Sequence, residues 1–199
     1  MTRRTVLGAA ALLLALAATG CSRSPRVTFY TLAPGAQVQV AAPERQLPVV
    51  AVGPVTLPEV VDRPQLVVRV AENRVEILES HRWAEPLKSE IPRLIAENLG
   101  RTLGSTRVSS YRQHAGRNAD YRVLIDIIRF ESADGAVTVE SSWSIRRAVG
   151  GAARAGHSLS REQVSGAGYD ALVAAYSRAL AGVSADLAEA IREEDAAGK

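Results

Sequence analysis

Cysteine is almost absent from this sequence: Cys21 is the single example in 199 residues. An internal disulfide is therefore excluded, and this residue needs an explanation of its own. Aromatic residues are also scarce, at 5% of the chain, so aliphatic side chains must supply most of any core.

An excess of charge is missing as well. The formal net charge of +3 comes from 24 basic and 21 acidic residues, and Arg3 and Arg4 are two of the basic ones. Without this pair the balance is 22 against 21, or +1. A nearly neutral chain argues against nucleic-acid binding, which depends on neutralising phosphates with a basic face.

Motifs for catalysis and metal binding are lacking. The sequence has no G-x-S-x-G, H-E-x-x-H or P-loop pattern, and His81, His114 and His157 are far apart. The run 166–171 matches G-x-G-x-x-A, but the residues before it are polar rather than a buried strand. We therefore expect no enzymatic activity, no metal and no cofactor.

The N-terminal segment 1–20 has the form of a secretory signal. Arg3 and Arg4 precede an apolar run from Val6 to Ala18 that is too short to span a bilayer. The run ends in a lipobox-like Ala18-Thr19-Gly20-Cys21, although leucine is more usual than Ala18. This predicts cleavage before Cys21 and a diacylglyceryl group on its thiol; export by the Sec or the twin-arginine route stays open.

Residues 21–26 would then form a lipidated tether. Ser22 follows the cysteine where an aspartate would signal retention in the inner membrane, so resemblance to sorted bacterial lipoproteins favours the outer membrane, with the domain facing the periplasm. The alternative is a secreted protein with a free thiol, which suits an oxidising compartment poorly.

The remainder, 27–195, is expected to form a single α+β domain. Apolar stripes at helical spacing predict helices from Leu87 to Leu103 and from Tyr169 to Ile191, with fraying after Glu193. Strands are predicted at 27–33, 47–52, 66–70, 75–79, 107–111, 121–131, 137–146 and 159–164, with a flexible tip at 148–158. One stripe per helix and one polar strand face predict a two-layer sandwich, with both helices on one face of a mixed or antiparallel sheet.

Between two of these strands lies an apolar loop with three prolines, Pro54, Pro58 and Pro64. Proline removes a backbone donor, so the loop is not expected to pair as a central strand. A stiff apolar loop beside a sheet is suited to contacting a partner. The predicted contact residues are Leu57, Pro58, Val60, Val61 and Arg63.

Simpler interpretations of the loop remain. Its apolar side chains, Val55 and Val60 above all, could fold back onto the domain's own core. Asp62 and Arg63 could form a ligand pair, but a turn-forming Asp62 and an Arg63 paired with a nearby carboxylate are favoured. Arg82 and Glu85, beside Trp83, are interpreted as the start of a helix.

Four stretches carry a family resemblance, and together they cover most of Val27 to Leu103, with a looser match to the end. They are Val52 to Arg69, Phe29-Tyr30-Thr31-Leu32, His81-Arg82-Trp83-Ala84-Glu85-Pro86-Leu87 and Ile95-Ala96-Glu97-Asn98-Leu99. In combination they resemble the ABC-type transport auxiliary lipoproteins of the PqiC type.

The resemblance implies an outer-membrane lipoprotein that works with an MCE-type membrane protein in lipid transport across the envelope. It also suggests a ring-shaped homo-oligomer, since symmetric closure is usual for such assemblies. Two alternatives stay open. One is a lipoprotein that itself binds a small apolar ligand, and the other is a periplasmic hydrolase using a serine and one of the three histidines.

Overall fold

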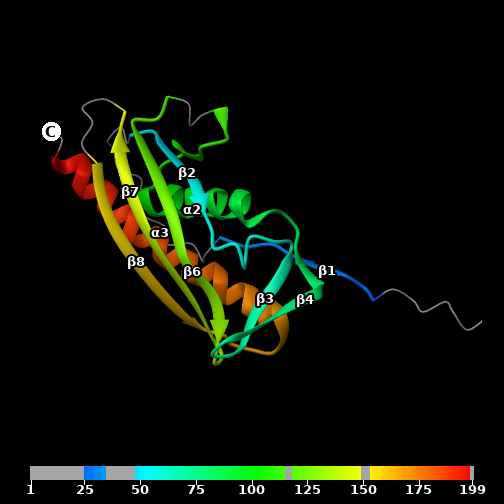
Figure 1. Ribbon diagram of the computed structural model, residues 1–199. Coiled ribbons are helices and arrows are strands. Elements are labelled where there is room, and N and C mark those ends of the chain that lie inside the picture. Colours follow the sequence, from blue (N-terminus) through cyan, green and yellow to red (C-terminus); the bar gives the residue numbers. More distant parts are fainter. Residues whose placement is uncertain (1–24, 35–47, 115–117, 149–152, 198–199) are drawn as a thin grey trace, which may run out of the picture.

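The computed structural model describes residues 25–34, 48–114, 118–148 and 153–197, so the predicted signal and Cys21 lie outside the described residues. The described chain is α+β, as predicted (Figure 1). Its elements in order are β1 (Thr28–Tyr30), β2 (Val50–Thr56), β3 (Gln65–Ala71), β4 (Arg74–Trp83), α2 (Leu87–Leu103), β5 (Val108–Ser110), β6 (Tyr121–Ala133), β7 (Ala136–Arg147), β8 (Ala153–Gln163) and α3 (Gly168–Ala197).

The larger sheet has five strands in the order β5-β2-β6-β7-β8. Strand β2 is parallel to both of its neighbours, whereas β7 is antiparallel to both β6 and β8. Asp134 and Gly135 make the tight turn between β6 and β7, both with positive φ, as their sequence predicts. Helices α2 and α3 pack on one face of this sheet, α2 against β2 and β5 and α3 against β7 and β8 (Figure 1).

A second sheet of three strands, in the order β1-β4-β3, was not predicted. The β3–β4 hairpin itself is confirmed, with Glu72 and Asn73 at its turn, and β1 adds to it in parallel. The proline-rich segment between β2 and β3 carries the chain out of the larger sheet, so the hairpin pairs separately while β3 contacts β6.

The prediction that the chain stops pairing before Pro54 is wrong. Strand β2 continues to Thr56, and Val55 and Thr56 pair with Ile125 and Asp126 of β6 after a register shift. Strand β5 pairs only with residues 50–52 of β2, so no strand of the larger sheet needs a donor from Pro54 on that side. The bulge and the open edge are the positions at which a strand tolerates proline.

The helices begin near the predicted residues, but the C-terminal part of the chain is more regular than predicted. Helix α2 passes through Pro92 and stops at Gly104, whose φ of 65° suits a helix C-terminus. Helix α3 runs to Ala197, beyond the predicted end at Ile191, and Arg147 of β7 contacts Glu194 in this last part at 3.4 Å. Strand β8 starts at Ala153, so most of the predicted flexible tip is paired with β7.

The core lies between the larger sheet and the two helices. Both predicted helical stripes are buried, and Leu180 and Leu187 of α3 have no exposed surface. Phe130 and Tyr176 stack at 4.2 Å between ring centres, with the edge of Trp83 against both rings. The few aromatic residues are thus concentrated where the hairpin sheet meets the main core.

Within the described residues, no helix is both long and apolar enough to cross a membrane.

Candidate interaction surface

The proline-rich loop and the β3–β4 hairpin enclose a shallow groove on one side of β6. The groove has a volume of about 130 Å³, and its lining is mostly apolar. Residues from the loop, the hairpin and β6 line it: Pro58, Val60, Val61, Val67, Arg69, Val75, Ile128, Arg129, Phe130 and Glu131. Sequence-distant segments therefore meet around the loop.

The predicted contact residues of the loop divide into two groups. Val61 is 7% exposed and belongs to the core, and Leu57 is partly buried against that core. Val60 is 43% exposed beside Pro58, so it does not fold back onto the core as the alternative interpretation of the loop held. The loop thus uses one valine for folding and presents the next to solvent.

Three further apolar side chains are exposed near Val60: Val75 and Ile77 on β4 and Ile128 on β6. Val60, Val75 and Ile128 all line the groove, and with Pro58 they are called the Val60 surface below. Single exposed apolar residues are common, but several gathered around one groove indicate a contact site.

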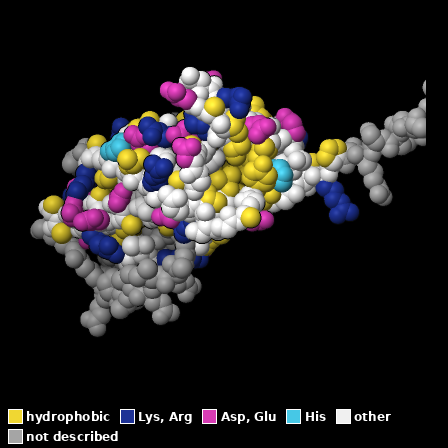
Figure 2. All heavy atoms as spheres, turned by 90° about the horizontal axis from the view of Figure 1, so that it is seen from below, with side chains coloured by type: hydrophobic (Ala, Val, Ile, Leu, Met, Phe, Trp, Pro, Cys, Tyr) yellow, Lys and Arg dark blue, Asp and Glu magenta, His cyan; other side chains and the backbone are white. Residues whose placement is uncertain are grey.

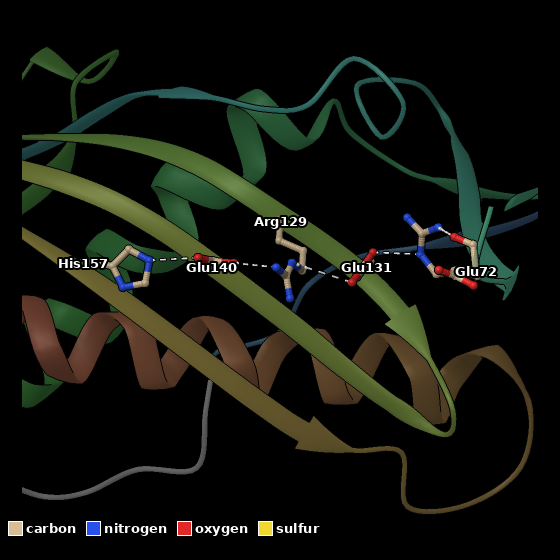
Figure 3. A network of polar contacts seen from close by, with 6 residues as sticks. Glu72, Arg129, Glu131, Glu140 and His157 are labelled. Atoms are coloured by element: carbon tan, nitrogen blue, oxygen red, sulfur yellow. Dashed lines mark hydrogen bonds and ion pairs between the residues drawn. The ribbon is translucent and has the colours of Figure 1, made fainter. Parts of the chain in front are cut away.

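A network of polar side chains runs across the strands (Figure 3), and Arg69, Arg129 and Glu131 also line the groove. Arg69 of β3 donates to Glu131 of β6 at 2.9 Å, and Arg129 contacts Glu140 of β7 at 3.2 Å. His157 of β8 lies 3.0 Å from the same Glu140. These contacts cross four strands, and the Arg69–Glu131 pair links the hairpin to the larger sheet at the groove.

Asp62 and Arg63 are adjacent in the loop but differ in their hydrogen bonds. Asp62 accepts a hydrogen bond from Lys88 Nζ at 2.5 Å, which joins the loop to the start of α2. The Nε atom of Arg63 is buried and has no hydrogen-bond partner, so the expected bond to a carboxylate is not made there. Asp62 and Arg63 both line a separate cavity of about 240 Å³, together with Trp83.

The charged residues beside Trp83 follow a different pattern from the predicted one. Arg82 contacts Glu79 at 3.5 Å, within β4, while Glu85 is exposed in the short connection before α2. The interpretation as the start of a helix therefore fits Glu85, which lies just before Leu87 of α2, but not Arg82, which belongs to strand β4.

A third hollow, of about 300 Å³, lies between the hairpin and the start of α3. Val68, Val164, Tyr169 and Leu172 provide its apolar walls. Figure 2, viewed from below, shows a broad hydrophobic patch on the face of the molecule that carries this end of the hairpin. Sequence patterns did not indicate this hollow because its walls come from β3, the β8–α3 connection and α3.

The histidines occupy separate places. His81 bonds to the Tyr30 hydroxyl at 2.8 Å and packs against Tyr169, while His157 pairs with Glu140. In the part of the chain that the structure describes, no three potential metal ligands cluster.

Glu90 on α2 is a buried carboxylate that sequence reasoning missed. It has no exposed surface, and its Oε1 accepts a hydrogen bond from the Leu32 amide at 2.7 Å. Burial raises the pKa of Glu90, while the Leu32 bond and the nearby Arg93 charge oppose that rise. Its position three residues after Leu87 and four before Leu94 puts it on the apolar stripe, which was an available signal.

The Glu90→Gln variant is expected to change how stability depends on pH. A raised pKa means that the folded state binds the proton more tightly, so stability falls as pH rises from about 4.5 through the folded-state pKa. The glutamine side chain keeps the acceptor for Leu32 without the charge, so the variant should lose that fall. Urea unfolding of both proteins across this pH range is the measurement, and an unchanged pH dependence in Glu90→Gln would contradict it. Glu90→Ala is the contrast, because leaving the Leu32 amide unpaired should cost about 1–3 kcal/mol.

The fold and the surface together define an α+β domain with an open apolar groove between its two sheets. Residues 30–188 match the family described as ABC-type transport auxiliary lipoprotein component. The chain therefore belongs to this family, which confirms the resemblance seen in the sequence.

Solved structures support the fold. An uncharacterized protein of known crystal structure is 20% identical, with a TM-score of 0.66 over 84% of this chain and 99% of that one. A Xanthomonas campestris protein of the DUF330 family is 19% identical, with a TM-score of 0.68 over 85% and 99% of the two chains. Among curated proteins, none matches the sequence.

Proposed function

We propose that this protein is the lipid-anchored, outer-membrane component of an MCE-type lipid-transport system. Membership of the transport auxiliary lipoprotein family supports the transport role. The lipobox-like sequence before Cys21 supports the acyl anchor, and Ser22 after it favours sorting to the outer membrane. The proposed partner is an MCE-domain membrane protein, and further copies of the chain would complete a ring.

The observation that carries a binding role, rather than a catalytic one, is the Val60 surface. It exposes apolar side chains from three separate elements beside the Arg69–Glu131 ion pair. Because the proline-rich loop is restrained, little conformational entropy is lost when a partner covers it. We assign partner contact to Pro58 and Val60, with Leu57, Val61 and Arg63 supporting the loop from behind.

Photo-crosslinking in intact cells tests this role. A photoreactive amino acid at Val60 or Ile128 should give a crosslink to an MCE-domain protein or to a second copy of the chain. The same group at Leu159, which is exposed on β8, is the control. Equal crosslinking at all three positions would contradict the assignment of the surface.

The lipid-anchor prediction concerns Cys21. In Cys21→Ser the thiol that takes the acyl group is gone, so unprocessed precursor should accumulate and palmitate labelling should be lost. Sucrose-gradient fractionation of the wild type should place it with outer-membrane markers. Normal processing and labelling of the variant would refute the anchor, and co-migration with inner-membrane markers would refute the sorting.

A direct role in lipid capture is the second candidate, favoured by the hollow of about 300 Å³ with apolar walls. Its volume is at the lower limit for a small-molecule site. Lipid extraction from the purified protein separates the two roles, because a capture protein carries lipid in the absence of any partner. The hydrolase alternative predicts loss of function when His81, His114 or His157 is changed to alanine.

A further inference from the structure

The described chain begins with an exposed apolar edge. Phe29 is 63% exposed and Val27 is 41% exposed, whereas Tyr30 and Leu32 are buried. Side chains alternate along a strand, so Tyr30 and Leu32 anchor this segment in the core while Val27 and Phe29 face the other way. These two residues are called the β1 edge.

Strand β1 lies at the border of its sheet, since it pairs with β4 alone in the order β1-β4-β3. Within the described residues, no strand covers its other side. An exposed phenylalanine on a bordering strand is a hazard for aggregation unless another surface covers it. The β1 edge lies close to Cys21 in the chain, and this position indicates which surface covers it.

The β1 edge follows Cys21 closely. Val27 is six residues after the cysteine (27 − 21), and a fully extended chain of that length spans at most about 20 Å. An acyl group at Cys21 would therefore keep the β1 edge close to the bilayer surface at all times. Tethering raises the effective concentration of the surface, so even a small apolar contact becomes populated.

Positive charge near the β1 edge also favours contact with the bilayer surface. Arg26 is exposed next to Val27, and Arg82 of β4, which also contacts Glu79 at 3.5 Å, is the register neighbour of Phe29. Figure 2 shows hydrophobic and basic side chains together where the described chain meets the N-terminal segment. Apolar residues beside arginines suit the headgroup region of an anionic bilayer.

We propose that Val27 and Phe29 insert into the headgroup region of the membrane that holds the acyl chains, with anionic phospholipid contacting Arg26 and Arg82. This inference rests on the proposed acylation of Cys21. It makes β1 a second membrane contact that orients the domain. In Figure 1 the N-terminal end and the C-terminal end of α3 lie at opposite ends of the molecule, so α3, about 45 Å long for 30 residues, carries its far end away from the bilayer.

The test uses the absence of any other cysteine. In the acylated full-length protein, Val27→Cys supplies the one free thiol for an environment-sensitive fluorophore. In phosphatidylethanolamine–phosphatidylglycerol vesicles, the probe at 27 should brighten, and lipids spin-labelled near the headgroup should quench it. The control is Leu159→Cys on β8, where the native side chain is 61% exposed. Quenching at 27 should be several-fold stronger than at 159.

A second substitution tests whether Phe29 is responsible for the quenching at position 27. Phe29→Asp in the Val27→Cys protein should reduce quenching to the level of position 159, whereas Leu159→Asp should leave it unchanged. Equal quenching at 27 and 159 in the acylated protein overturns the proposal. A spectral shift that appears without lipid and grows with protein concentration also overturns it, because a second copy then covers the edge.

The intact mass of the purified protein shows whether Cys21 carries an acyl group. This measurement therefore tests the proposed anchor separately from membrane contact by the β1 edge. A chain without an acyl group contradicts the anchor at Cys21 and leaves the β1 edge to be tested on that chain. Its co-sedimentation with the same vesicles should then decrease several-fold on Phe29→Asp. Sedimentation that does not depend on Phe29 would refute membrane contact by β1.

Discussion

Replacing Leu180 or Leu187 with alanine should lower the free energy of unfolding by about 2–5 kcal/mol. Both side chains lie on α3 with no exposed surface, and they are part of the core formed with the larger sheet. Truncation removes buried methyl groups and leaves a cavity that close-packed neighbours fill only in part. Urea unfolding at constant pH measures the loss.

Glu189 on the same helix provides the matched control. Its side chain is exposed, so Glu189→Ala should change stability by less than about 0.5 kcal/mol. Arg178 is a weaker control, because it contacts Glu162 of β8 at 3.0 Å and an exposed ion pair contributes up to about 1 kcal/mol. Equal and small losses at Leu180, Leu187 and Glu189 would mean that α3 does not pack on the sheet.

Two neighbouring valines of the proline-rich loop should give opposite results when each is changed to aspartate. Val61 is 7% exposed within the core, and a carboxylate there has no partner, so Val61→Asp should unfold the protein or lead to its degradation. Val60 is 43% exposed, so Val60→Asp should keep the thermal midpoint of the wild type. Thermal unfolding of the two variants measures this difference in stability.

The functional half of this comparison concerns partner contact. A charge at position 60 would be buried against an apolar partner, so Val60→Asp should fold but fail to crosslink or to complement a deletion strain. Leu57→Asp, at a partly buried position, should fall between the two valine variants in stability. A folded Val60→Asp protein with full function and unchanged crosslinks would show that the loop is only a connection.

Several features could be predicted from the sequence because they depend on local spacing. The helical stripes, the Asp134–Gly135 turn and the Gly104 stop follow from side-chain periodicity and from the backbone freedom of particular residues. The family also follows from the sequence, since its motifs are contiguous runs that need no three-dimensional context. The helices, most of the strands and the α+β class were therefore predicted in advance.

Long-range pairing was decided only by the tertiary structure. Whether Pro54 lies in a strand depends on which neighbours flank β2, and the last turns of α3 are contacted by Arg147 from the distant strand β7. Glu90 is tolerated in the core because Leu32, 58 residues away, supplies its hydrogen bond.

The contrast between Val60 and Val61 in the proline-rich loop was also decided by the tertiary structure. Val60 and Val61 are chemically identical and adjacent, so no composition or pattern distinguishes them. Both line the groove beside the hairpin and β6, but Val61 is packed into the core whereas Val60 stays exposed. The sequence determined that an apolar loop would stand beside the sheet, and packing between distant segments determined which of its side chains stays exposed.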